Sequence, residues 1–352
     1  MSQLPVQLGL SPFHQRIPWI GGDLQTLRDT LRPQRFPPDR AEPLTIPLED
    51  GDQLLGLLDR PTGAMPAALV LVVHGLGSSS DSPGPRRLAL ALLAAGFAVL
   101  RLNLRGAGRG RPLARGTYCA SCSEDLRPAV ALARQLAGEQ PLLGAGLSLG
   151  GTVLLNGCLA GLAFDGLVCL SSPLQLDVCT AQFERRRNWV YQRWLVQRLR
   201  EQTLADPGGL QEAERLAMAG PGRARTIRAF DAAITTPRWG FASVAGYYAA
   251  ASPLAPLIAG QPLPPTLLLH AADDPWVPVG PLSQLAAALP GQPGEAGAGS
   301  DPAELTAAPR IVITPRGGHN GFHAPGDGPT ASWADRLAVA WLRHLSRGEG
   351  AG

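Results

Sequence analysis

The chain has 352 residues, of which 45% are hydrophobic and 17% charged, a composition typical of a globular protein with a substantial core. All 31 basic residues are arginine, which excludes chemistry that needs a lysine, such as a Schiff base, a P-loop or a Ser-Lys dyad. The formal net charge of +3 is small for this length and gives no indication of nucleic-acid binding.

The five cysteines are an odd number in a large chain and do not indicate a disulfide framework. Cys119 and Cys122 form a C-x-x-C pair, but no second pair or nearby histidine completes the four ligands of structural zinc. We interpret both as ordinary thiols and expect neither a metal nor a cofactor. We find no signal peptide and no apolar run of about 18 residues, so we expect no membrane-spanning segment and a cytoplasmic protein.

The first half of the chain alternates strands with helices after a proline-rich stretch, residues 1–43, which we expect to form an arm packed on the domain. Residues 44–48 and 54–58 flank a turn and predict an antiparallel hairpin. Apolar runs typical of strands covered on both faces occupy residues 67–73, 97–104, 142–145 and 166–170. Helical patterns follow the first three of these runs, at residues 86–95, 123–136 and from 152. This alternation predicts a mostly parallel, doubly wound α/β sheet.

The alternation stops after residue 173 and resumes near residue 261. Residues 174–260 have helical periodicity, many arginines and no clear strand, which predicts a helical cap inserted into a core of residues 44–173 and 261–347. The second part of the core contains a strand at 266–270, a helix at 281–289, a strand at 310–314 and a closing helix at about 332–345. Residues 290–309 have the composition of a flexible surface loop, and we expect residues 348–352 to be a disordered tail.

A G-x-S-x-G pentapeptide at residues 146–150 joins the predicted strand at 142–145 to the helix that follows. A serine at such a sharp turn takes up a strained backbone conformation that lifts its Oγ clear of the sheet, and bulky neighbours would clash there. The start of the next helix directs free N–H groups to the place where an oxyanion would form. Ser148 is therefore the candidate nucleophile.

Two further strand ends supply partners for Ser148, in the chain order Ser148, Asp274, His319. The reacting groups of parallel sheets lie beyond the carboxyl ends of the strands, where all three residues fall. Histidine can take and return a proton near neutral pH, and an aspartate can hold its ring in the right tautomer. The backbone N–H groups of Leu76 and Leu149 are the candidate oxyanion donors.

Alternatives remain for the acid and the base. Asp273 competes with Asp274, which we prefer because the D-x-x-V-P spacing places it at the turn. The other histidines that compete with His319 are His74, His270 and His323. The glycines before His319 suit a tight catalytic loop, whereas His270 lies inside a strand and we interpret it as structural. His74 precedes the predicted oxyanion turn, and we interpret it as a residue that orders this loop.

Two other patterns suggest functions outside a triad. The glycines at 106 and 108 follow a strand, but the third glycine of G-x-G-x-x-G is missing, so we do not predict a dinucleotide site. The segment 183–199 carries arginines beside Trp189, Tyr191 and Trp194. It is either an interfacial helix that meets lipid or a solvated cap helix. We favour the solvated helix and leave a peripheral lipid contact open.

With these residues in place, the chain resembles the YheT branch of the α/β-hydrolases, which also includes the related animal ABHD proteins. The matching stretches are residues 22–27, 74–79, 103–108, 146–151, 230–231, 240–241, 247–248, 273–275 and 317–322. The resemblance implies a serine hydrolase that acts on carboxylic esters, with its triad on Ser148, Asp274 and His319. The chain departs from the family at two places. Asp23 stands where the family usually has a histidine, and Tyr118-Cys119 stands where it usually has a Tyr-His pair.

We therefore predict an α/β-hydrolase fold with an inserted helical cap. The expected reaction is hydrolysis of a small-molecule ester through an acyl-Ser148 intermediate, with lipid esters and short- or medium-chain acyl esters as candidate substrates. An acyltransferase or a thioesterase would use the same triad, and a non-catalytic scaffold is the alternative from another class.

Overall fold

The computed structural model describes residues 2–63, 65–219, 222–289, 309–328 and 330–347. In these residues eight strands form one sheet in the order β1-β2-β4-β3-β5-β6-β7-β8. The strands are β1 (Glu42–Pro47), β2 (Gln53–Asp59), β3 (Leu69–Val73), β4 (Ala98–Asn103), β5 (Leu142–Leu147), β6 (Gly166–Leu170), β7 (Thr266–Ala271) and β8 (Arg310–Thr314). Neighbouring strands from β4 to β8 are parallel, whereas β2 is antiparallel to both β1 and β4. The predicted mostly parallel α/β sheet is confirmed.

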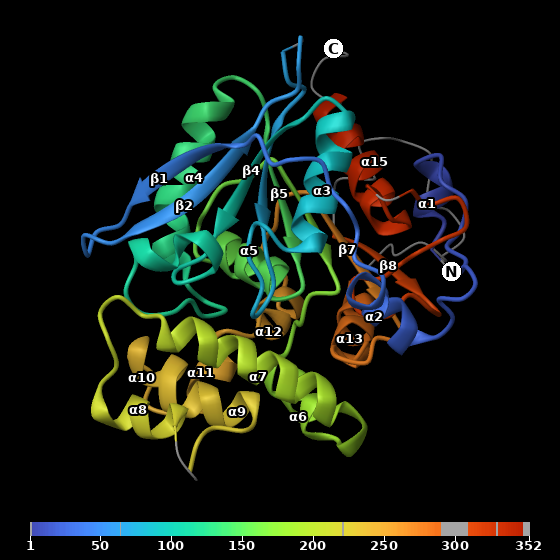
Figure 1. The fold of residues 1–352 in the computed structure, drawn as a ribbon. Coiled ribbons are helices and arrows are strands. Elements are labelled where there is room, and N and C mark those ends of the chain that lie inside the picture. The colour runs from blue at the N-terminus through green and yellow to red at the C-terminus, as the bar shows by residue number, and fades with distance from the viewer. Residues whose placement is uncertain (1, 64, 220–221, 290–308, 329, 348–352) are drawn as a thin grey trace.

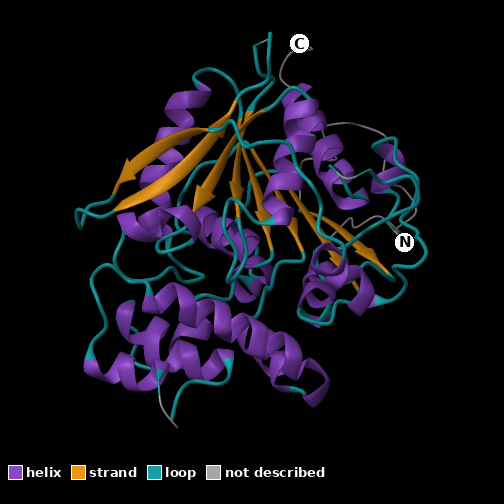
Figure 2. Cartoon of the chain, in the orientation of Figure 1, coloured by secondary structure: helices purple, strands orange, loops and turns teal. Residues whose placement is uncertain are grey.

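Helices cover both faces of this sheet (Figures 1 and 2). Strand β3 illustrates the consequence, because Leu69 and Leu71 belong to one hydrophobic core and Val70 and Val72 to the other. The first core is completed by α4 (Ser123–Ala137), α5 (Leu149–Leu159) and α13 (Gly280–Ala288), and the second by α3 (Pro83–Ala94) and α15 (Trp333–Arg347). Helix α3 begins three residues before the predicted start, because prolines are compatible with the first turn of a helix.

The N-terminal stretch contains two helices that the sequence analysis did not predict, α1 (Leu4–Gln7) and α2 (Gly22–Leu31). Leu4 is fully buried in the core that contains α15. Gln25 of α2 is also fully buried, and its side chain exchanges hydrogen bonds of 3.1 and 2.7 Å with the backbone of His323. Helix α2 is thereby fixed against the segment that follows the last strand.

The segment between β6 and β7 contains helices and no strand among its described residues. These helices are α6 (Leu176–Glu184), η2 (Arg186–Asn188), α7 (Trp189–Leu204), α8 (Glu212–Met218), α9 (Ile227–Phe230), the π-helix η3 (Asp231–Thr235), α10 (Thr236–Arg238), α11 (Val244–Ala250) and α12 (Leu254–Ile258). Figure 1 shows α6 to α11 gathered beyond the carboxyl ends of the strands. We refer to residues 174–260 as the cap.

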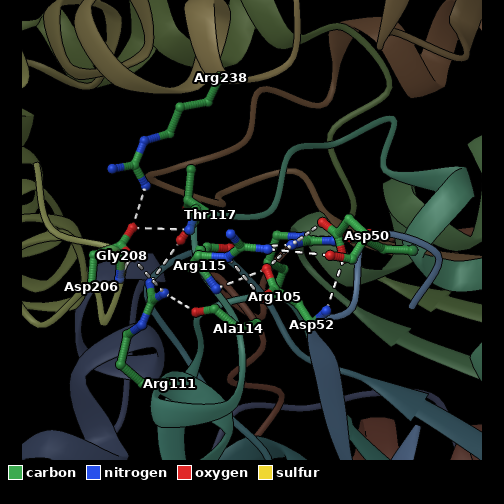
Figure 3. A network of polar contacts seen from close by, with 12 residues as sticks. Asp50, Asp52, Arg105, Arg111, Ala114, Arg115, Thr117, Asp206, Gly208 and Arg238 are labelled. Atoms are coloured by element: carbon green, nitrogen blue, oxygen red, sulfur yellow. Dashed lines mark hydrogen bonds and ion pairs between the residues drawn. The ribbon is translucent and has the colours of Figure 1, made fainter. Parts of the chain in front are cut away.

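A buried polar network joins the cap to the core beside the 3₁₀-helix η1 (Gly108–Leu113) (Figure 3). Asp206 follows α7 and accepts a hydrogen bond of 2.9 Å from the N–H of Gly116. The same carboxylate pairs with Arg238 at 2.8 Å and with Arg111 at 3.6 Å. Arg238 pairs in turn with Glu214 of α8 at 2.6 Å. This end of the cap is therefore fixed by several mutually satisfied charges.

Two predictions concern segments outside the described residues, namely the flexible loop at 290–309, apart from residue 309, and the tail at 348–352. Within the described ranges, no helix combines the length and the apolar character that a membrane crossing requires.

Candidate active site

Ser148 lies at the turn between β5 and α5 with a backbone φ of 53° and ψ of −126°. This left-handed conformation is strained for a residue with a side chain and is typical of functional positions. The flanking glycines are required by close backbone approaches. A Cβ on Gly146 would lie 2.3 Å from Cα of Gly151, and one on Gly150 would lie 2.2 Å from the carbonyl oxygen of Val73. The pentapeptide therefore folds as a tight strand-to-helix turn.

The structure brings Ser148, His319 and Asp274 together as a hydrogen-bonded chain. His319 Nε2 lies 3.0 Å from Ser148 Oγ, and His319 Nδ1 lies 2.8 Å from Asp274 Oδ2. The other carboxylate oxygen of Asp274 accepts the backbone N–H groups of Trp276 and Val277 at 2.8 and 2.9 Å. Because both carboxylate oxygens are engaged, Asp274 can hold the imidazole in one orientation.

The two neighbouring aspartates differ in their partners. Burial by itself raises the pKa of Asp274, but the adjacent His319 and His270 outweigh burial and hold that pKa below its ordinary value. Asp273 instead accepts the N–H of Gly318 at 2.9 Å, and burial raises its pKa above the ordinary value. Asp273 thus braces the backbone just before His319, and Asp274 contacts the ring.

The remaining histidines of the sequence analysis have structural partners. His74 Nδ1 donates to the carbonyl of the next residue at 2.8 Å, and its Nε2 accepts the N–H of Leu104 at 3.2 Å. Burial lowers the pKa of His74 to about 4, so its ring is neutral near pH 7. His270 Nε2 lies 2.9 Å from the carbonyl of Val277, and burial lowers the pKa of His323 to about 3. All three histidines are buried, and among the described residues none of them forms a hydrogen bond with Ser148 Oγ.

The candidate oxyanion donors lie on either side of the nucleophile. Leu149 is the first residue of α5, directly after Ser148. Leu76 follows Gly75, where a Cβ would lie 3.0 Å from Cβ of Ser148, so this loop passes directly against the serine. Within the part of the chain that the structure describes, neither N–H group donates a hydrogen bond. Both are therefore free to donate to a negatively charged oxygen formed beside Ser148.

Trp276 is a site residue to which the sequence analysis gave no role. Its ring stacks on His319 with centroids 4.6 Å apart and an interplanar angle of 25°. The indole also contacts aromatic rings of the cap, with centroid distances of 5.6 Å to Phe183, 5.5 Å to Tyr191 and 6.2 Å to Trp194. The only sequence signal was its position two residues after Asp274. This indole connects the cap to the histidine ring.

The serine opens into a cavity of about 1040 Å³ between the core and the cap. Apolar side chains line most of it, among them Leu76, Leu149, Phe183, Leu195, Phe230 and Tyr247. This volume is at the upper end of the range for sites that bind small organic molecules. An apolar ligand of substantial size can therefore reach Ser148.

One carboxylic acid lies in the cavity apart from the triad. Asp231 of the π-helix η3 accepts hydrogen bonds from Tyr248 at 2.7 Å and from Thr235 at 2.8 Å. Burial raises the pKa of Asp231 to about 6, although these hydrogen bonds and Arg228 act in the opposite direction. π-Helical turns frequently occur at functional sites.

The described ranges contain no group of three or more His, Cys, Asp and Glu side chains that could hold a metal ion. Cys119 and Cys122 are buried free thiols, and their mutual hydrogen bond together with burial raises the pKa of Cys122.

Comparison with known proteins places this architecture in a family. A family model described as Hydrolase_4 (serine aminopeptidase, S33) matches residues 64–296. The chain is 30% identical to YheT of Escherichia coli, which is named as a candidate esterase, over 242 residues that cover 66% of this chain and 69% of YheT. It is 26% identical to the human phospholipase ABHD3 over 238 residues, which cover 64% of this chain and 52% of ABHD3.

Solved structures show the same fold at lower identity. The Pyrococcus furiosus esterase Pf2001 superposes with a TM-score of 0.52 at 16% identity, over 94% of this chain and 99% of that one. A mostly parallel sheet with a serine at its strand-to-helix turn is the architecture of the α/β-hydrolases. The chain belongs to the Hydrolase_4 family of α/β-hydrolases, in the branch of YheT and the ABHD proteins, which confirms the resemblance seen in the sequence. Its enzyme class is that of the carboxylic ester hydrolases.

Proposed function

We propose that the chain hydrolyses carboxylic esters through an acyl-Ser148 intermediate, with His319 as the general base and acid and Asp274 as the residue that orients it. The observation that carries this proposal is the hydrogen-bonded chain from Ser148 Oγ through His319 to Asp274, at distances of 3.0 and 2.8 Å. The free N–H groups beside the serine and the apolar cavity above it support the same reaction.

The first half-reaction acylates the serine. His319 Nε2 takes the proton of Ser148 Oγ as this oxygen attacks the ester carbonyl carbon, while Nδ1–H donates to Asp274. The carbonyl oxygen becomes negatively charged, and the N–H groups of Leu76 and Leu149 stabilise it. The tetrahedral intermediate collapses, His319 returns the proton to the leaving alcohol, and the acyl group remains on Ser148.

The second half-reaction releases the acid. A water molecule replaces the alcohol and gives its proton to His319 Nε2 as its oxygen attacks the acyl carbon. Collapse of the second tetrahedral intermediate breaks the bond to Ser148 Oγ, which recovers the proton. The products are a carboxylic acid and the free enzyme, so the two steps together consume one water.

We assign the substrate class from the cavity lining and from the names of the relatives. Burial of an acyl chain against apolar side chains contributes about 0.8 kcal/mol per CH₂ group, so a cavity of this lining favours esters with a hydrocarbon chain. The relatives named above are a candidate esterase and a phospholipase, which supports acyl esters, including lipid esters, as the substrates.

The test is labelling with a fluorophosphonate, which reacts only with an activated serine, followed by peptide mass spectrometry. We expect one adduct, on Ser148, that is absent in Ser148→Ala and in His319→Ala. Turnover of a soluble p-nitrophenyl ester should fall at least about 1000-fold in both variants, while the melting temperature shows that they fold. Labelling of another serine, or full turnover in Ser148→Ala, would refute the assignment, and a folded protein without any adduct would favour the scaffold.

The two aspartates supply a second test. Asp274→Asn should lower kcat by about 1000-fold or more, because an amide cannot hold the imidazole in the tautomer that accepts the serine proton. Asp273→Asn keeps an acceptor for the N–H of Gly318 and should cost less than about tenfold. Similar losses in the two variants would contradict the choice of Asp274.

Product analysis distinguishes hydrolysis from acyl transfer on the same triad. We expect the free acid as the main product when an alcohol and a thiol are each added as competing acceptors. A new ester or thioester as the main product would replace hydrolysis by transfer as the function of the site.

A further inference from the structure

The outward face of α7 has an unusual composition. Trp189, Val190 and Trp194 are 58%, 65% and 46% exposed, and they occupy the face opposite the buried residues Tyr191 and Leu195. A helix on a protein surface usually directs polar side chains to the solvent. Here three large apolar side chains are exposed near the start of the helix beside Arg193, and the packing of the cap does not account for them.

Positive charge predominates on this face, and its exposed acids are Glu184 and Glu201 at the two ends. Residues 185–200 contain six arginines and no acidic residue. Two of the arginines lie over the exposed indoles, Arg193 at 5.6 Å from the ring of Trp189 and Arg198 at 5.7 Å from that of Trp194. Tryptophan together with arginine is the composition of protein surfaces that lie at the headgroup level of a membrane.

This face adjoins the entrance to the cavity. Val190 and Trp194 contribute to the cavity lining as well as to the exposed surface. Across the entrance, Asp23 of α2 contacts Arg187 and Tyr191 of the cap at 2.9 Å each. Any external surface that contacts the outer face of α7 would therefore lie next to the entrance of the cavity.

We propose that the outer face of α7, with Trp189, Val190, Arg193 and Trp194, docks on an anionic lipid bilayer together with the preceding Arg185 and Arg186. The indoles would lie among the headgroups, and the arginines would pair with anionic lipid phosphates or carboxylates. Docking does not depend on the reaction, whereas the further step, that the bilayer delivers an acyl ester to Ser148, rests on the proposed function. A second copy of the chain is a poor partner, because two such faces would bring the arginines of residues 185–200 close to one another.

The experiment is co-sedimentation of the full chain with phosphatidylcholine vesicles, with and without 30% phosphatidylserine. We expect binding to the anionic vesicles at least about tenfold tighter than to the neutral ones, and weaker binding as salt is raised. A variant with Trp189→Ser, Arg185→Gln, Arg186→Gln and Arg193→Gln should lose at least about tenfold of this affinity. These four residues do not line the cavity, so turnover of a soluble short-chain ester should stay unchanged.

A matched control changes one exposed apolar residue and three exposed arginines elsewhere. It carries Leu216→Ser, since Leu216 is 64% exposed on α8, with Arg127→Gln, Arg223→Gln and Arg225→Gln at other exposed positions. The control has the same net charge as the α7 variant and should bind anionic vesicles like the parent chain. Equal loss in both variants would reduce the effect to net charge and overturn the proposal.

Three other results would also overturn it. These are no binding to anionic vesicles, equal binding to neutral ones, and a dimer in sedimentation equilibrium that the α7 variant disperses. Failure of the proposed function is visible separately, because a chain that binds anionic vesicles but hydrolyses no soluble ester would retain the docking surface and lose the reaction.

Discussion

Two of the places where the cap meets the core differ in burial and chemistry. At one end, the side chain of the cap residue Asp206 is 2% exposed and that of its core partner Arg111 9% exposed, within the network of Figure 3. At the other end, over the site, Asp23 and Arg187 form an ion pair whose side chains are 52% and 58% exposed. The same kind of contact therefore occurs once out of water and once in it.

This difference determines how firmly each end is held. Loss of one partner from a buried pair leaves a charge without compensation, whereas an exposed pair contributes about 1 kcal/mol or less because water screens it. At the exposed end the ion pair is joined by aromatic packing, since Trp276 lies between His319 and the cap residues Phe183 and Tyr191. Asn188 also donates a buried hydrogen bond of 2.7 Å to the carbonyl of Pro275. We expect any opening of the cap to occur at α6 and the start of α7, and to change the surroundings of His319 directly.

The largest expected effect is at the buried end. Asp206→Ala should lower the free energy of unfolding by about 4 kcal/mol, because Arg238 and Arg111 lose a buried partner and the N–H of Gly116 loses its acceptor. Urea unfolding followed by circular dichroism measures the loss. Asp23→Asn is the matched control at the exposed end, because it removes the charge that pairs with Arg187 and keeps an oxygen that can accept the Tyr191 hydroxyl, and it should cost about 1 kcal/mol or less. Equal losses would remove the distinction between the two ends.

The next effect concerns the interior of the cap, where Asp231 is buried. The folded chain raises the pKa of this acid to about 6, above the value of about 4 expected when unfolded. Stability due to the neutral acid is therefore fully present below about pH 4 and is lost as the pH rises through about 6. The loss is roughly 3 kcal/mol, at about 1.4 kcal/mol for each pH unit between the two pKa values.

Asp231→Asn tests this, because the amide stays neutral at every pH. Relative to the parent chain, the variant should gain roughly 3 kcal/mol of unfolding free energy between pH 4 and pH 8, as urea titrations at both pH values would show. A difference between variant and parent that is the same at both pH values would mean that Asp231 does not titrate in this range.

The contrast between local and tertiary information explains what the sequence could predict. The strands and the serine turn are local features, because continuous apolar runs and closely spaced glycines suffice to predict them. The sequence also indicated that the three triad candidates lie at the same edge of the sheet, because all three follow the carboxyl ends of parallel strands. The structure brings these three residues together, and their catalytic roles stay a prediction until they are tested.

The features that escaped the sequence analysis depend on polar or distant contacts. Helix α2 buries Gln25 and Arg28, so hydrophobic periodicity could not reveal it. The stacking of Trp276 on His319 joins residues on two different loops, and no spacing rule relates them. Asp206 and Arg238 likewise become a pair only when the cap closes on itself.

The smallest expected effect is at the exposed end, and it tests the comparison most directly. A double-mutant cycle with Asp23→Asn and Arg187→Gln should give a coupling energy of about 0.5 kcal/mol in low salt, falling toward zero in 1 M salt, because exposed charges are screened. The aromatic contacts of Trp276 are unchanged in all four chains and do not enter the coupling. A coupling above about 2 kcal/mol that persists in salt would mean that this pair holds the cap as firmly as the buried network does. The end over the active site would then be fixed as well, and opening of the cap would have to involve both attachments.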